Sequence, residues 1–230
     1  MFSKDKLTYA PLPLPHRASL SPEEMQAAAD AFHDKMTQRH TVRDYADTDV
    51  DLVTIETSIK TAGLAPSGAN HQPWHFVAIS DPAFKKRIRA AAEEEERKFY
   101  AGGAGDEWIE ALEPIGTNAE KPHLETAPWL IVIFSERYGE FLDGTRYKNY
   151  YVPESVGIAT GFLITALHHA GLVSLTHTPN PMSFLNELCD RPGSNKPMMI
   201  LAVGHPAEDA EVPTVAKIKK PLEQIMTVYK

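Results

Sequence analysis

The segment between Val156 and Leu167 constrains the fold of this chain most, because its side chains are apolar almost all the way round. Its 12 residues are too few to cross a bilayer, since a membrane-spanning helix needs about 20. A helix without a polar face is stable in water only when other elements cover it. We therefore expect a helix over residues 153–171 at the centre of the molecule, with the other elements folded around it.

Helix and strand signals alternate on both sides of this segment. Ser21-Pro22-Glu23-Glu24 is a capping box with proline at the first helical position, and it predicts a helix to about Arg39. Apolar spacing and proline signals predict further helices over residues 50–64, from 80 onward, over 108–112 and over 182–189. Runs rich in β-branched and aromatic residues predict strands over residues 74–79, 129–134, 172–176 and 199–203. Helix has the larger share, so the sequence predicts a layered α+β fold around one sheet.

The chain of 230 residues is interpreted as one domain, because no repeat, low-complexity segment or long linker divides it. Residues 1–20 lack the continuous apolar stretch of a signal peptide, and their proline-rich part indicates an extended N-terminal arm. Residues 207–230 are interpreted as a C-terminal extension. The sequence contains no membrane-spanning segment, and we expect a soluble, cytoplasmic protein.

Composition excludes several classes of function. A protein surface that binds nucleic acid is basic, so the net charge of −8 argues against such a surface. The single cysteine excludes a disulfide within the chain and sites for zinc or iron–sulfur clusters built from several cysteines. Cys189 lies beside leucines and is interpreted as a packed thiol rather than a nucleophile. The ten histidines show no zinc spacing, so no metal site is predicted.

Two motifs arrange polar groups in a way that suits a ligand. Residues 39–43, Arg-His-Thr-Val-Arg, place two guanidinium groups four residues apart with a hydroxyl between them, which suits one phosphate. The alternative is a solvated helix end, where the helix dipole favours cations. Residues 65–74, Ala-Pro-Ser-Gly-Ala-Asn-His-Gln-Pro-Trp, combine small and polar residues with two stiffening prolines. This loop either lets a flat ligand approach the backbone or only connects a helix rigidly to a strand.

Together these two motifs resemble the FMN-dependent nitroreductase superfamily. Three further features resemble its iodotyrosine deiodinase branch: an acidic helix ending in Glu96 and Tyr100, Lys121 before Glu-Thr-Ala-Pro, and Gly-Leu-Val-Ser-Leu-Thr-His-Thr-Pro over residues 171–179. The resemblance covers about residues 30–228. It implies a nitroreductase-like layered fold with a central mixed sheet flanked by helices. It also implies an intertwined homodimer with FMN at the subunit interface.

The resemblance implies that FMN is held without a covalent bond. The phosphate would meet Arg39, Arg43 and Lys219, where lysine stands for an arginine of the animal members. The Thr178 hydroxyl would meet flavin N5 and favour one-electron steps over hydride transfer, which is the catalytic role expected of this residue. The other residues expected to bind FMN are His40, Thr41, Val42, Ser67, Thr176 and His177.

A free amino acid is a zwitterion, so its site needs an anion for the ammonium group and a cation for the carboxylate. Glu96 and Tyr100 share one face of the predicted helix at a spacing of i, i+4, and Lys121 supplies a cation. The resemblance makes these three residues substrate ligands, with the Ala69 backbone N–H at the phenol oxygen. The acidic, glycine-rich stretch over residues 101–120 resembles a lid that closes over the substrate. Taken singly, Glu96 would belong to a solvated acidic face and Lys121 to the surface.

The function that follows is reductive dehalogenation of halotyrosines by reduced FMN. The implied partners are a second copy of the chain, the halotyrosine and an external electron donor, which is NAD(P)H acting directly or through a reductase. One alternative is an NAD(P)H-dependent nitroreductase or enone reductase on the same fold. Another is a protein that binds flavin or an aromatic amino acid without turnover.

Overall fold

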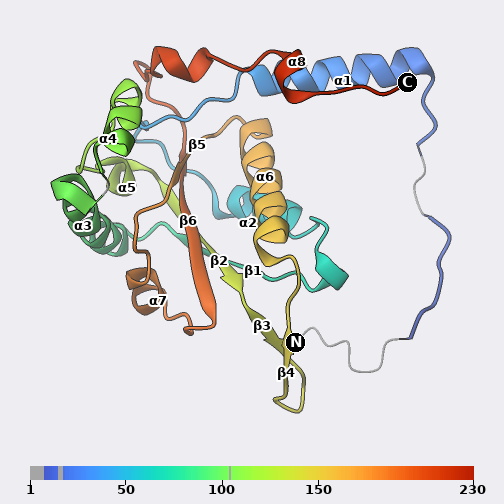
Figure 1. Ribbon diagram of the computed structural model, residues 1–230, viewed down its shortest axis with the longest axis horizontal. Coiled ribbons are helices and arrows are strands. Elements are labelled where there is room, and N and C mark those ends of the chain that lie inside the picture. Colours follow the sequence, from blue (N-terminus) through green and yellow to red (C-terminus); the bar gives the residue numbers. More distant parts are fainter. Residues whose placement is uncertain (1–7, 15–17, 104) are drawn as a thin grey trace.

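A four-stranded sheet lies at the centre of the computed structural model, which describes residues 8–14, 18–103 and 105–230 (Figure 1). The strands lie in the order β1 (Trp74–Ile79), β2 (Trp129–Glu136), β6 (Asn195–Gly204) and β5 (Val173–His177). All four correspond to predicted strands. A hairpin of β3 (Tyr138–Glu140) and β4 (Arg146–Lys148), which was not predicted, follows β2.

The sheet is antiparallel rather than mixed, which corrects the expected strand arrangement. β2 and β5 run in the same direction, as strands joined through a crossover helix do. β6 lies between them, however, and runs antiparallel to both. Within the described chain, parallel pairing is limited to an isolated bridge between Thr41 and Ser174.

Helices begin where the capping signals predict them. At α1 (Pro22–Thr37) the Ser21 hydroxyl accepts a hydrogen bond from the Glu24 amide, and the Glu24 carboxylate accepts one from the Ser21 N–H. Asp81 caps α3 (Pro82–Lys98) by accepting from a backbone amide of the first turn. The other α-helices are α2 (Leu52–Ala62), α4 (Asp106–Leu112), α5 (His123–Thr126), α6 (Val152–His169), α7 (Phe184–Leu188) and α8 (Leu222–Ile225).

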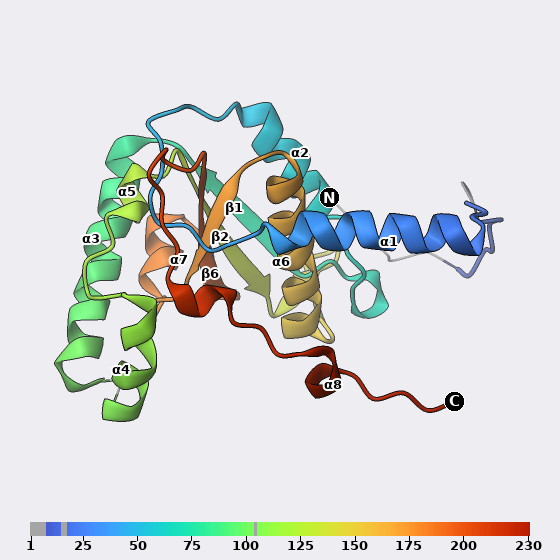
Figure 2. The same ribbon diagram turned by 90° about the horizontal axis from the view of Figure 1, so that it is seen from above.

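Alternation along the central strands produces a core on each face of the sheet. Ile131 and Ile133 of β2 belong to one core, which also contains Leu163 of α6. Leu130 and Phe134 point the other way and belong to the core that α3, α5 and α7 help to form. Figures 1 and 2 accordingly show α2 and α6 on one side of the sheet and α3, α5 and α7 on the other. The result is a three-layered α+β fold.

Helix α6 is present as predicted, but the chain covers only one of its faces. Leu163 and Leu167 face the sheet and are fully buried. The opposite face carries Gly157 and Gly161, where an added Cβ would meet no atom within 4 Å, and Phe162, which is 41% exposed. The expected burial all round is therefore not achieved within one chain, because no described element packs against this second face.

Both ends of the chain extend from this body as arms. No residue of α1 is buried, and the tail that contains α8 is exposed. In Figure 2 both arms project past α6 on the same side of the molecule. Of the expected N-terminal arm, residues 1–7 and 15–17 lie outside the described residues, whereas residues 8–14 are exposed and form neither helix nor strand. None of the described helices combines the length and the apolar character that crossing a membrane requires.

Cys189 follows α7 and packs against the core on the α3 side of the sheet. Burial raises the pKa of its thiol to about 11, so the thiol is protonated at neutral pH. The side chain therefore behaves as a packed apolar group, as interpreted from the sequence.

Candidate active site

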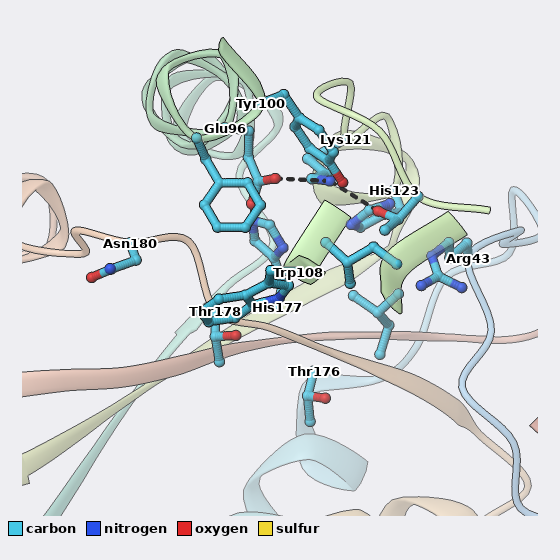
Figure 3. Close-up of a pocket in the computed structure, with 14 residues that line it drawn as sticks. Arg43, Glu96, Tyr100, Trp108, Lys121, His123, Thr176, His177, Thr178 and Asn180 are labelled. Carbon is cyan, nitrogen blue, oxygen red and sulfur yellow. Dashed lines mark hydrogen bonds and ion pairs between the residues drawn. The ribbon is translucent and has the colours of Figure 1, made fainter. Parts of the chain in front are cut away.

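A cavity of about 270 Å³ lies between the end of α3, the α4 segment, α5 and β5 (Figure 3). It contains an ion pair in which Lys121 Nζ lies 3.1 Å from Glu96 Oε2, with the two side chains 4% and 13% exposed. Lys121 also donates hydrogen bonds to Thr117 Oγ1 and to the Asn118 carbonyl. The alternatives of a surface lysine and a solvated glutamate are therefore excluded for this pair.

The acidic run over residues 93–96 contains members with different surroundings. Glu93 accepts a hydrogen bond of 2.7 Å from the Lys121 backbone N–H and pairs with Arg89, which ties α3 to the segment before α5. Glu94 is exposed and pairs with Arg97. Of the four glutamates, Glu96 is the one that lines the cavity.

Tyr100 follows Glu96 by four residues, and the structure places both side chains at the cavity, as expected. The chain leaves α3 through a π-helical turn over Phe99–Gly103, a geometry that is frequent at functional sites. The Tyr100 hydroxyl is buried and has no hydrogen-bond partner among the described residues. Lys121 Nζ lies 5.7 Å from the centre of the Tyr100 ring. A carboxylate, an ammonium group and an unpartnered phenol thus face one cavity, which suits a ligand with both charges.

A second cavity of about 440 Å³ adjoins the first, because Arg43 and Thr176 line both. Arg39 and Arg43 reach this cavity from the segment after α1, and Lys219 reaches it from the C-terminal extension. Three cations from distant parts of the sequence therefore converge on one space. Two guanidinium groups, each with paired N–H donors, and one lysine ammonium group together suit a phosphate group. His40 and Thr41 line this second cavity as well.

The segment over residues 101–120 forms a helical cover above both cavities, apart from residue 104, which lies outside the described residues. Trp108 of α4 lines the first cavity, and Pro114 lines the second. Trp108 packs edge-on against Phe99, with ring centres 5.5 Å apart. In Figure 3 its indole lies between Glu96 and Thr178. This segment lies beside both cavities, and its closure over a substrate stays a prediction.

Alternation along β5 separates three consecutive residues that were expected at the cofactor. Thr176 and Thr178 are exposed, and both line the first cavity. His177 points to the opposite side of the strand, where its buried ring also lines the first cavity and lies near Glu96. Val42 is also buried, and its amide donates to the Ser174 carbonyl, so its side chain lines neither cavity.

Ser67 and Ala69 lie on the loop between α2 and β1 and line neither cavity. Figures 1 and 2 show this loop beyond α6, on the side away from α3 and α4. The loop is held closely, because Ser67 Oγ accepts from the Gln72 amide and a Cβ at Gly68 would lie 2.5 Å from the Tyr150 carbonyl oxygen. Within a single chain, Ser67, expected at the cofactor, and Ala69, expected at the phenol oxygen of the substrate, therefore lie away from both cavities.

Several residues that line the first cavity were given no role from the sequence, and Trp108 and His123 are two of them. Trp108 was placed on a short helix without a role, although a tryptophan in an acidic, glycine-rich stretch is an unusual apolar residue and a usable signal. His123 was not singled out, yet it lies at the start of α5 with an exposure of only 5%. No local pattern distinguishes it from the other histidines. Across the described residues, no three or more His, Cys, Asp or Glu side chains converge as a metal site.

Of the two adjoining cavities, one is lined by opposite charges and suits a small zwitterion, and the other is lined by three cations and suits a phosphate-bearing group. The chain belongs to the nitroreductase family, whose model, described as "Nitroreductase family", matches residues 36–205. Over 212 residues it is 49% identical to iodotyrosine deiodinase of Haliscomenobacter hydrossis. The aligned region covers 92% of this chain and 95% of that protein. Iodotyrosine deiodinase 1 of Homo sapiens is 41% identical over 205 residues, or 89% of this chain and 70% of that protein.

Solved structures agree with this assignment. A crystal structure of oxidized iodotyrosine deiodinase bound to FMN and 3-iodo-L-tyrosine superposes with a TM-score of 0.70 at 31% identity, over 86% of this chain and 98% of that one. A BluB-like flavoprotein from Clostridium difficile gives a TM-score of 0.66 at 22% identity, over 86% and 98% of the two chains, and shows the fold alone. The nitroreductase-like fold that the resemblance implied is thereby confirmed.

Proposed function

We propose that this chain is an FMN-dependent reductive dehalogenase of halotyrosines. The observation that carries the proposal is the buried Glu96–Lys121 pair, which faces the unpartnered Tyr100 hydroxyl in a cavity next to the cluster of three cations. A site of opposite charges suits an amino acid, and a phosphate site beside it suits FMN. Relatives named iodotyrosine deiodinase, with identities up to 49%, support the same substrate class.

The residues present fit FMN. Arg39, Arg43 and Lys219 would hold its phosphate, and the exposed Thr176, on β5, and Thr178, just after it, would face the ring system with their hydroxyls. When bound and reduced, FMN supplies the two electrons that, with one proton, convert a carbon–halogen bond into a carbon–hydrogen bond and a free halide. Because each cycle consumes two electrons, we propose an external donor, NAD(P)H acting directly or through a reductase.

The chain itself binds and orients the substrate. Glu96 would take the ammonium group and Lys121 the carboxylate, so the zwitterion replaces a protein ion pair by two new ones and leaves no buried charge unpaired. The unpartnered Tyr100 hydroxyl would contact the same end of the substrate, which carries the ammonium and carboxylate groups. The α4 segment, with Trp108 at the cavity, would exclude water and strengthen these contacts.

The decisive experiment is an anaerobic reaction of the reduced, FMN-loaded protein with 3-iodotyrosine. The flavin should return to its oxidised spectrum while iodide and tyrosine appear in amounts equal to the flavin consumed. A flavin that stays reduced with iodotyrosine, yet is oxidised by a nitroaromatic compound, would favour the nitroreductase alternative. A protein that binds iodotyrosine and never releases iodide would favour a binding protein.

Replacing Arg43 by glutamine should weaken FMN binding about tenfold or more, because a hydrogen bond to a charged group contributes about 1.5–3 kcal/mol. Riboflavin, which lacks the phosphate, should bind with unchanged affinity. The measurement is a fluorescence titration of apoprotein with each flavin. Arg87→Gln, on the exposed side of α3, is the matched control and should change neither affinity. Equal weakening for both flavins would contradict a phosphate role for Arg43.

The same chain is proposed to act as an intertwined homodimer. Between α1, α2 and α6 lies an apolar groove of about 810 Å³, lined by residues such as Phe32, Val53 and Phe162. The exposed face of α6, the extended arms and this groove together form a large uncovered apolar surface. In a symmetric dimer the loop with Ser67 and Ala69, remote from the cavities of its own chain, would reach those of its partner.

A further inference from the structure

Three buried side-chain atoms at the first cavity have no hydrogen-bond partner within the part of the chain that the structure describes: the Tyr100 hydroxyl, His123 Nε2 and His177 Nε2. A buried polar group without a partner is destabilising, so such a cluster indicates contacts that form when a ligand binds. The proposed substrate accounts for Tyr100. The two histidines have no part in the function proposed above.

His177 faces the carboxylate of Glu96. Its ring lies on the side of β5 opposite to its two threonine neighbours and is 8% exposed, and Nε2 lies 3.9 Å from Glu96 Oε1. The other carboxylate oxygen, Oε2, lies 3.1 Å from Lys121 Nζ. The two oxygens therefore face different nitrogens. A small approach of His177 would close a hydrogen bond of about 2.9 Å.

The surroundings keep both histidines neutral. Burial, together with His123, Lys121 and Arg43, lowers the pKa of His177 to about 3. Burial and Lys121 lower the pKa of His123 to about 4. A neutral imidazole still donates one N–H. Unlike lysine, it can hold a carboxylate oxygen in place without cancelling the negative charge.

A ligand for an ammonium group must be fixed in direction while its charge stays available. In the free cavity, Lys121 is the charge partner of Glu96, but this contact is given up when Lys121 turns to a substrate carboxylate. His177 Nε2 is then the remaining titratable nitrogen that the described residues bring within 4 Å of Glu96. We propose that His177 is a positioning residue, which donates its Nε2–H to Glu96 and aims the carboxylate at the substrate ammonium group. The inference rests on the proposed function and adds a residue that acts through Glu96.

The test is a double-mutant cycle on the FMN-loaded protein, with the dissociation constant of 3-iodotyrosine measured by flavin fluorescence quenching. His177→Leu removes the donor and should weaken binding about tenfold, the share of one hydrogen bond to a charged group. His177→Gln carries an N–H at a similar reach and should recover most of the affinity. When Glu96→Gln is already present, His177→Leu should have no further effect. FMN affinity and thermal unfolding establish that each variant is folded, and His177→Thr replaces the leucine variant if that one is not.

The matched control is His75→Leu, the same substitution at a half-buried histidine of β1 that lines neither cavity, and it should bind iodotyrosine within about twofold of wild type. A loss from His177→Leu that persists in the Glu96→Gln background, or that glutamine fails to recover, would overturn the proposal. Failure of the wild-type protein to bind iodotyrosine would overturn the proposed function, and this inference with it. If only the results for the His177 variants contradict the proposal, the wild-type protein still binds iodotyrosine, so the two failures are distinguishable.

Discussion

Replacing Glu96 by glutamine is expected to weaken the binding of 3-iodotyrosine at least about thirtyfold. Removing one member of a buried, hydrogen-bonded charge pair costs about 2–5 kcal/mol, and each 1.4 kcal/mol is a factor of ten. Glutamine keeps the size of the side chain but cannot neutralise the substrate ammonium group, and it leaves Lys121 without its partner at 3.1 Å. The measurement is a titration of the oxidised, FMN-loaded protein, followed by flavin fluorescence.

The matched control for this change is Glu94→Gln, two residues earlier on the same helix. Glu94 forms an exposed ion pair with Arg97 at 2.9 Å, and such pairs contribute about 0–1 kcal/mol. The control should therefore bind iodotyrosine like the wild type. Unchanged binding by Glu96→Gln would exclude Glu96 as the ammonium ligand, and with it the zwitterion site.

The second large effect concerns the exposed face of α6. Phe162→Glu is expected to weaken the proposed homodimer by more than about a hundredfold, because two-fold symmetry would bury one unpaired carboxylate from each chain. FMN affinity should fall with the dimer, since the loop with Ser67 and Ala69 lies away from the cavities of its own chain. Analytical ultracentrifugation measures the first effect, and a flavin titration measures the second.

Lys86→Glu provides the control, because Lys86 is exposed on α3, which packs on the other side of the sheet from α6. This variant should sediment like the wild type and retain FMN. A wild-type protein that sediments as a monomer while holding FMN would contradict the dimer. A Phe162→Glu variant that remains dimeric would show that another surface joins the two chains.

Much of the fold was predictable because its signals act over a few residues. The capping box at Ser21 and the run of β-branched and aromatic residues in β2 depend on neighbours along the chain, and both predicted elements formed where expected. The strand order was not predictable in the same way. β6 lies between β2 and β5, and that insertion makes the sheet antiparallel. It depends on packing between distant segments, which no local pattern records.

The same distinction between local signals and tertiary packing applies to the candidate site. The sequence by itself determined which groups are available: two arginines four residues apart, a glutamate and a tyrosine on one helical face, and a family resemblance that placed Lys121 and Lys219 with them. Only the tertiary structure decided that Lys121 is buried against Glu96 and that His177 lies beside the Glu96 carboxylate. It also decided that the Ser67 loop lies apart from the cavities. The physical reason is that burial and charge pairing arise between segments that the sheet brings together, whereas motifs report only neighbours along the chain.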